Sequence, residues 1–540
     1  MGVIKSFLQG GEDKEENPQK KSYLITSVQS IQTPQHADHY TKDSSRGAPN
    51  EALIKNFDEH AQREDAQSII LQMPGMGRTE QQLHKFFEGR EDLITPIENF
   101  ERLKRDLDRE KIRIKRLEER AEKKGCRVDQ LGYVDYDYIS RGTDYLEKGK
   151  ILTDSGIPLN TKITIANVNY PPQNKNPWRG AQDAVQHHLE KTIIMASPKQ
   201  TIVPFAKNLS SKLPRLEVSP GACTLPNYNS QDSRGKSANW NHQYGFSRVD
   251  IINSNLYLVR LIPALKNGTF FDLGMKYEPD KKPKKAKVLA FVPGDIHYGE
   301  HDEGALEASL RIHEELKPEN CMLHDFFSFY SINPHESENL IKEEQDYAMG
   351  RTNLEKEVAL GSAYLKKYAK NFPKTDFWII DSNHHDFLHR YLMGDKYIKD
   401  KENRAFGRRI ATLFGESNDM PVEAAMKYVL GGKMPKNIHF LKRGQDFRLG
   451  GTQLSAHGHK GPNGARGSFP SLKTAYGRIL FGHTHMIRQE GNALTCGTLA
   501  KIPMEYQLGQ PATSIHGAGI LYEGGLIQAI PIINGIYKAE

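Results

Sequence analysis

Short apolar runs, each followed by polar side chains, recur through the second half of the chain. The runs at 288–292, 377–380 and 479–481 have the length and the bounding polar residues typical of buried strands. Residues 302–316 follow the pattern of a helix, and a helix-rich stretch of about sixty residues is expected before residue 456. Strands that alternate with helices in this way predict an α/β domain.

The hydrophobic pattern differs in the first half of the chain. Residues 1–50 contain few large apolar groups in periodic order, which predicts a disordered or loosely attached arm. The pattern then becomes helical, and later changes to short β-branched runs separated by Pro, Gly and Asn. We therefore expect four segments: an N-terminal arm (1–50), a helical region (51–150), a β-rich accessory domain with a basic linker at 281–285 (151–285), and a catalytic domain (286–540).

One stretch of the helical region has apolar residues at heptad spacing, with Glu110 as the one charged interruption. The heptad positions are occupied by Phe100, Leu103, Leu107, Ile114, Leu117 and Ala121. Three heptads favour a short coiled coil, through which the chain would form a homo-oligomer, or a helical hairpin arm. A single amphipathic helix packed on its own domain fits the same pattern.

A helix, a turn and a second helix are also predicted ahead of this stretch. Thr79 and Gln82 follow the breaker at 74–77 and are spaced as a capping box, so the second helix is expected at about 79–88. Such a pair could bind DNA, although helix pairs with a glycine-containing turn are common.

Residues able to bind metal follow several of the apolar runs in the second half. They are Asp295 and His297, Asp325, Asn383 and His384, His457, and His483 and His485 in the sequence Gly-His-Thr-His. The carboxyl ends of parallel strands share one edge of a sheet, so we expect these side chains to converge. A ligand set of carboxylates, imidazoles and one amide suits Mn²⁺, Fe or Zn²⁺. It has too many nitrogen ligands for Ca²⁺ or Mg²⁺, which prefer oxygen.

In their order these motifs resemble the calcineurin-like metallophosphoesterase superfamily, and the resemblance covers roughly residues 286–530. The family motifs are Asp-x-His, Gly-Asp, Gly-Asn-His-(Asp/Glu), a lone His and Gly-His-x-His. This chain departs from them twice: His324 replaces the Gly before Asp325, and Ser382 and His385 flank the Asn-His pair in place of Gly and an acid. The second departure leaves open which group orients His384. The resemblance implies a four-layer α/β/β/α sandwich.

The resemblance also implies a centre with two divalent ions, of which manganese is the expected species by family analogy. One ion would be held by Asp295, His297 and His485, the other by Asn383, His457 and His483, with Asp325 as the bridge. His384 would be the catalytic imidazole outside the ligand set. The implied reaction is hydrolysis of a phosphodiester by in-line attack of a metal-bound hydroxide.

The motifs indicate the class of reaction but not the substrate, because the superfamily includes protein phosphatases, nucleotide phosphodiesterases and DNA-repair nucleases of the SbcD type. The chain has 74 Lys and Arg against 67 Asp and Glu, a net charge of +7, which is compatible with a polyanionic partner. Arg234, Lys236 and Trp240 lie in a basic-aromatic loop suited to unpaired bases, or to plugging the edge of its own domain. Lys460 and Arg466, in a Gly-rich stretch, could contact a nucleic-acid backbone or belong to an ordinary turn.

Over its whole length the chain is also similar to a pre-early nuclease of a large tailed bacteriophage that degrades host DNA. That similarity implies double-stranded DNA as the substrate and the infected bacterial cytoplasm as the location. No stretch approaches the roughly 18 apolar residues of a membrane span, so no membrane partner is expected. The alternatives are a metallophosphatase or phosphodiesterase acting on small nucleotides or phosphoproteins, and a DNA-binding regulator with an inactive metallophosphoesterase shell. The complete ligand set argues against the regulator.

Overall fold

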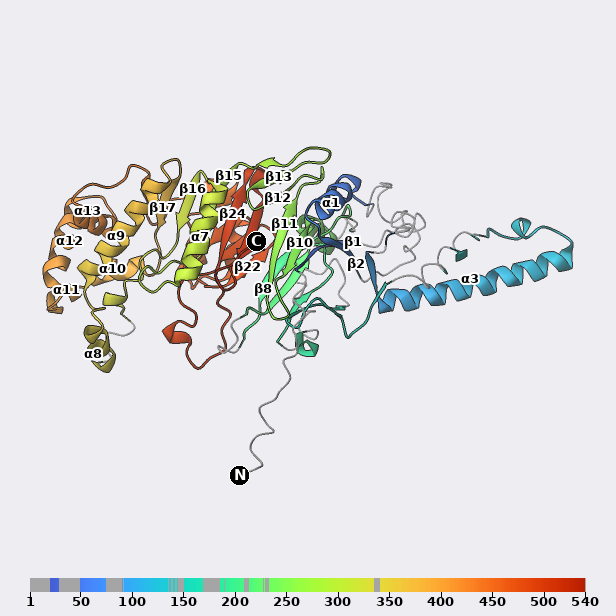
Figure 1. Ribbon diagram of the computed structural model, residues 1–540, viewed down its shortest axis with the longest axis horizontal. Coiled ribbons are helices and arrows are strands. Elements are labelled where there is room, and N and C mark those ends of the chain that lie inside the picture. Colours follow the sequence, from blue (N-terminus) through green and yellow to red (C-terminus); the bar gives the residue numbers. More distant parts are fainter. Residues whose placement is uncertain are drawn as a thin grey trace, which may run out of the picture.

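The computed structural model describes residues 20–28, 49–73, 90, 92–134, 136, 139–140, 143, 150–168, 185–188, 190–207, 213–226, 228, 233–334 and 340–539. These residues form three mixed or largely antiparallel sheets with helices packed around them, so the protein is a mixed α/β protein (Figure 1). Among the described helices, none combines the length and the apolar character that a membrane crossing requires.

A six-stranded sheet carries most of the predicted ligands. Its strands, in order, are β18 (Ile438–Leu441), β17 (Asp376–Ile380), β16 (Asn320–Leu323), β15 (Val288–Pro293), β24 (Gly517–Tyr522) and β25 (Ile527–Pro531). Strands β15 to β18 are parallel, while β24 and β25 are antiparallel to their neighbours. The strands predicted at 288–292 and 377–380 are confirmed, and their carboxyl ends lie at one edge of this sheet.

Helices pack on one face of the six-stranded sheet (Figure 1). They are α7 (Glu303–Leu316), α9 (Leu354–Asn371), α10 (His385–Met393), α12 (Arg404–Glu416) and α13 (Pro421–Val429). The helix predicted at 302–316 is therefore confirmed as α7, and the helix-rich stretch before residue 456 is confirmed as well. Side chains alternate along β15, because Phe291 points to these helices whereas Ala290 and Val292 point to the opposite face.

That opposite face packs on a ten-stranded sheet through a core that includes Leu480 and Leu494. In order the strands are β19 (Arg448–Leu449), β20 (Thr452–Gln453), β21 (Ile479–Phe481), β23 (Ala493–Cys496), β22 (Ile487–Glu490), β8 (Gln200–Pro204), β9 (Leu216–Pro220), β7 (Thr192–Ile194), β6 (Ile163–Ile165) and β5 (Ile157–Pro158). On the outer face of this sheet, α14 (Phe469–Tyr476) packs against Ile479 and Phe481.

The ten-stranded sheet combines the two halves of the chain. Strand β22 pairs with β8, with Gln489 opposite Ile202, so strands from the segment 151–285 continue the sheet of the segment 286–540. The division of the chain near residue 285 stays a prediction. These hydrogen bonds show that the segments on its two sides are joined edge to edge.

A third sheet of nine strands contains a strand that the sequence pattern missed. Its order is β14 (Lys284–Lys285), β13 (Met275–Tyr277), β12 (Phe270–Asp272), β11 (Tyr257–Ala264), β10 (Tyr244–Ile251), β1 (Lys21–Val28), β2 (Gln67–Gln72), β3 (Leu93–Pro96) and β4 (Lys150–Leu152). The expectation of a loosely attached arm over 1–50 is wrong for β1, which lies inside this sheet. Strand β14 likewise pairs the end of the predicted linker with β13, although both of its lysines remain exposed.

The predicted heptad stretch is α3 (Ile97–Lys124), a helix that projects from the nine-stranded sheet between β3 and β4 (Figure 1). Leu103, Leu107, Ile114 and Ala121 are buried. The chain that follows returns along the helix, since Arg113 donates to the carbonyl of Tyr133 and the Tyr136 hydroxyl donates to Glu118. The described residues after α3 therefore pack back on the helix, and the choice between the alternatives from the sequence stays a prediction.

Part of the predicted helix–turn–helix lies outside the described residues. Helix α1 (Glu51–Arg63) is followed by strand β2, and the turn at 74–77 and the helix at 79–88 lie outside the described residues. The segment 51–150 therefore contains strands as well as helices. The remaining elements are α6 (Ser233–Asn241), α8 (Leu340–Ala348), α11 (Lys396–Lys399), η2 (Val128–Gln130), η3 (Tyr330–Ile332), η4 (Pro462–Gly464), η5 (Glu505–Gln507) and η6 (Glu523–Gly525).

Strand β1 is expected to be essential for stability. Leu24 is fully buried on one face of the strand, against α1, while Ile25 is buried on the other. We expect Leu24→Ala to destabilise the protein by about 2–5 kcal/mol, because it leaves a cavity in a packed core. Thermal unfolding measures the effect, with Lys21→Ala at the exposed start of the same strand as control. Equal unfolding midpoints for the two variants would contradict the interior position of β1.

Self-association through α3 stays a prediction. If the helix forms a coiled coil between chains, mass photometry of the protein will show a multiple of the monomer mass, and substituting the partly exposed heptad residue Leu117 by Glu will leave a folded monomer. A strictly monomeric wild type would contradict the coiled coil and leave the hairpin arm as the whole explanation of the heptads.

Candidate metal centre

The predicted ligands lie on loops at or near the carboxyl ends of five strands. Asp295 and His297 follow β15, Asp325 follows β16, Asn383 follows β17, His457 follows β20, and His483 and His485 follow β21. Four of these residues have left-handed backbone, with φ of 46° at His297, 36° at Asp325, 71° at His483 and 55° at His485. Each such conformation costs on the order of 1–3 kcal/mol, so the surrounding structure must hold these turns in place.

One group of donors consists of Asp295, His297, Asp325 and His485. Their ligand atoms all lie within 4.8 Å of one another, and all four residues are buried. Nε2 of His297 is 3.1 Å from Nε2 of His485, which is 3.4 Å from Oδ2 of Asp295. With metal–ligand bonds of about 2.1 Å, donors at right angles lie about 3.0 Å apart, so this group has the dimensions to hold one ion.

A second group of donors lies beside the first. Oδ1 of Asn383 is 2.9 Å from Nε2 of His457 and 3.0 Å from Nδ1 of His483. Nε2 of His457 is also 3.1 Å from Oδ2 of Asp325. The same Asp325 oxygen is 3.9 Å from Nε2 of His297 in the first group. Oδ2 of Asp325 is thus common to both groups.

Three of the four ligand imidazoles are in the form that binds metal, whereas at His457 the charge of Asp325 outweighs the effect of burial and raises the pKa. Burial lowers the pKa of His485 to about 3 and that of His483 to about 4. Burial also holds the pKa of His297 well below its ordinary value, and nearby histidines add to the effect. Neutral rings present a nitrogen lone pair without first losing a proton, which favours coordination near neutral pH.

The two carboxylates repel each other within the protein. Burial raises the pKa of Asp295 to about 8, and the charge of Asp325 contributes. Burial opposes ionisation of Asp325 too, but His457 and His384 outweigh it and hold its pKa well below the usual range. Oδ1 of Asp295 is buried without a hydrogen bond from any described residue. A cation placed between the carboxylates would relieve this repulsion and satisfy that oxygen, so the residues fit a metal.

The orientation of His384, which the sequence left open, comes from the backbone. Its ring Nδ1 lies 2.6 Å from the carbonyl oxygen of Ser328, and its backbone N–H donates to Oδ1 of Asp325 at 3.3 Å. A carbonyl only accepts, so Nδ1 carries a proton and Nε2 is the atom available for chemistry. The ring packs edge-on against His297, with centroids 4.5 Å apart.

Other histidines surround the donors and hold them in position. His385, which occupies the place of the family acid, is buried; its Nδ1 donates to the carbonyl of Ile380 at 2.9 Å, and its Nε2 accepts from the N–H of Phe327 at 3.4 Å. Nδ1 of His324 lies 3.3 Å from Nδ1 of His457. His459 packs beside His457, with ring centroids 5.5 Å apart. Such contacts fix the rotation of a ligand ring.

Two features of the centre were not found by sequence reasoning. The Tyr506 hydroxyl lies 3.0 Å from Nδ1 of His485, while 66% of the residue remains exposed. No motif marks this tyrosine, which lies twenty-one positions beyond its histidine. The backbone N–H of His483 donates to Oδ2 of Asp295 at 2.6 Å, a contact that depends on the close approach of Gly482.

The predicted substrate-binding residues fall into two sets. Lys460 and Arg466 are exposed and lie opposite each other across a short hairpin beside the donors. Burial and His457 lower the pKa of His459 to about 3, with a contribution from Lys460. By contrast, Lys236 and Trp240 are exposed on α6, and no contact among the described residues connects them to the donors. The side chain of Arg234 lies outside the described residues.

Comparison with known proteins gives one informative likeness. The chain is 28% identical to Protein A1 of Escherichia phage T5 over 410 residues, which cover 72% of each protein. No family model matches the chain, and no solved structure matches it. The chain is therefore similar to a bacteriophage protein and carries a buried cluster of Asp and His that could hold a metal ion.

Gly482 provides a direct test of the geometry. A Cβ at this position would lie 2.1 Å from Oδ1 of Asp295, a buried carboxylate with no room to withdraw. We expect Gly482→Ala to reduce the metal content of the purified protein at least tenfold, measured by elemental analysis. The matched control is Gly415→Ala in α12, where a Cβ would meet nothing within 4 Å. Full metal content in Gly482→Ala would show that Asp295 is not a ligand.

Proposed function

We propose that the protein is a nuclease that hydrolyses DNA phosphodiester bonds with two divalent metal ions. The observation that carries this proposal is the position of Oδ2 of Asp325, which is shared by two groups of metal-binding side chains. A single structural ion would need only one of these groups. A bridging carboxylate between two sets of nitrogen and oxygen donors is the arrangement used for paired-ion hydrolysis.

The layers of the fold support assignment to the calcineurin-like metallophosphoesterases. Helices α7, α9 and α10 cover the six-stranded sheet, the ten-stranded sheet packs on its other face, and α14 lies beyond that. We propose that these layers are the α/β/β/α sandwich implied by the motifs. The donors lie at the carboxyl edge of strands, where α/β folds carry their sites.

Each donor group has a defined part in this proposal. Asp295, His297 and His485 would hold one ion and Asn383, His457 and His483 the other, with Asp325 shared. Bound ions would activate a water molecule and neutralise phosphate charge. Manganese is the proposed species, because it accepts mixed carboxylate and imidazole donors.

Electrostatics select an anionic substrate. Two divalent ions bring four positive charges and the two aspartates return two negative ones, so the loaded centre attracts a phosphodiester anion. Lys460 and Arg466 stand beside this centre as further cations. They would contact the nucleic-acid backbone on either side of the bond that is cleaved.

His384 is the proposed catalytic residue. Because the Ser328 carbonyl holds Nδ1–H, a protonated ring would present Nε2–H to a non-bridging oxygen or to the leaving oxygen. No acid is needed for this orientation.

The proposed setting is a bacterium infected by a phage. The phage origin of the similar protein supports it. In that setting the substrate would be double-stranded host DNA in the bacterial cytoplasm.

Plasmid DNA tests the proposal. We expect degradation in Mn²⁺ and none after chelation with EDTA. His384→Ala is expected to lower the cleavage rate by about 10²–10⁴-fold, the usual contribution of general acid catalysis, while the metal content stays unchanged. His439→Ala, on β18, is the control histidine and should cleave at the wild-type rate. Hydrolysis of small phosphate esters without DNA cleavage would favour the phosphodiesterase alternative, and a gel shift without any hydrolysis would favour the inactive regulator.

A further inference from the structure

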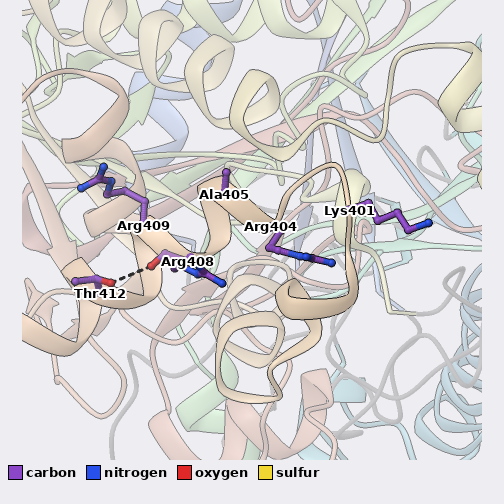
Figure 2. A pocket seen from close by; sticks show the side chains of 6 residues that line it. All are labelled: Lys401, Arg404, Ala405, Arg408, Arg409 and Thr412. Carbon is purple, nitrogen blue, oxygen red and sulfur yellow. Dashed lines mark hydrogen bonds between the residues drawn. The ribbon is translucent and has the colours of Figure 1, made fainter.

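Helix α12 has a strongly basic exposed face that the centre does not use. Its apolar side chains Phe406 and Ile410 are buried in the core beneath the six-stranded sheet. The opposite face lines an open cavity of about 730 Å³ (Figure 2). The cavity is lined by Lys401, Arg404, Ala405, Arg408, Arg409 and Thr412.

The cations of this face are not held in ion pairs within the described part of the chain. No carboxylate among the described residues forms an ion pair with the four cations that line the cavity. The nearest acids in sequence form hydrogen bonds with hydroxyl groups instead. Asp400 accepts from the Tyr391 hydroxyl at 2.9 Å, and Glu402 accepts from the Thr352 hydroxyl at 2.6 Å. Within α12 the first acid is Glu416 at its end. The face therefore projects a positive potential into solvent.

The arrangement of the arginines suits a row of phosphates. Arg404 and Arg408 are four residues apart, about 6 Å along the helix axis, so their guanidinium groups can contact different phosphates. Arg409, the next residue, lies further round the helix and widens the basic face. A guanidinium group binds phosphate oxygens through two parallel hydrogen bonds, and it stays charged at all physiological pH values.

The lining favours a duplex over single strands, nucleotides and membranes. It contains no aromatic ring, whereas single strands and nucleotides are held largely by stacking on aromatic side chains. A membrane-binding helix would need its apolar face free, and in α12 that face is buried. We infer that the exposed face of α12 is a docking surface for the phosphodiester backbone of duplex DNA.

The position of α12 connects this surface to the proposed chemistry, and as a substrate-docking surface it rests on the proposed nuclease function. Helix α12 packs on α10, and α10 begins at His385, the residue after the proposed catalytic histidine. The same helical layer would then hold the duplex and present His384. Contacts of this kind with the DNA phosphates position the duplex without selecting a base sequence.

The test removes the three arginine charges without altering the centre. In Arg404→Gln/Arg408→Gln/Arg409→Gln, we expect at least tenfold weaker binding of a 30-base-pair duplex, measured by fluorescence anisotropy in EDTA. The slope of log affinity against log salt should become shallower by about 0.9 for each phosphate group that the variant no longer neutralises. Hydrolysis of bis(p-nitrophenyl) phosphate in Mn²⁺ should keep the wild-type rate, because this small diester needs only the centre.

A control of equal charge change separates a local surface from general attraction. Lys356→Gln/Lys367→Gln/Lys370→Gln removes three exposed cations from α9 and should bind the duplex like the wild type. Duplex binding that is unchanged in the α12 variant, or equally weakened in the α9 variant, would overturn the inference. So would loss of binding to anionic phospholipid vesicles with DNA binding retained.

The same measurements distinguish failure of the surface from failure of the nuclease. A wild type that binds duplex through α12 but cleaves none in Mn²⁺ supports the surface and removes the proposed activity. A wild type that cleaves DNA while the α12 variant binds and cleaves equally well keeps the activity and removes the surface.

Discussion

The centre depends on the position of one carboxylate, that of Asp325. Its Oδ2 lies between two groups of donors, 3.1 Å from His457 and 3.9 Å from His297, while Oδ1 accepts the backbone N–H of His384. One oxygen is therefore held by the chain and the other is directed to both groups. The left-handed backbone at Asp325 makes this possible, and its cost must be met by the packing around β16.

The donors around Asp325 are held by contacts on their far sides. Tyr506 contacts His485, His324 contacts His457, and the Ser328 carbonyl holds His384. Because these contacts limit the rotation of the rings, the centre is organised for a cation before one arrives. The replacement of the family acid by His385 therefore leaves His384 oriented, since the Ser328 carbonyl binds its Nδ1.

The nine-stranded and ten-stranded sheets make the first half of the chain a structural support for this centre. Strand β22 begins two residues after His485, and its outer edge pairs with β8. The turn that carries His483 and His485 is therefore braced by a strand from the accessory segment. On the far side, α10 starts directly after His384 and carries α12 with its basic face.

Local sequence determined the strands at 288–292, 377–380 and 479–481, the helix that became α7, and the side chains that gather at the strand ends. These features are encoded by short-range periodicity, which survives without knowledge of the partner strands. Only the tertiary structure decided that Lys21–Val28 is an interior strand, because its burial comes from pairing with Gln67–Gln72 on one side and, on the other, with Tyr244–Ile251, which lies more than 200 residues away in the sequence. It also decided which groups orient the histidines: a backbone carbonyl at Ser328 has no signature in the sequence, and the Tyr506 contact exists only because a distant loop folds over the centre.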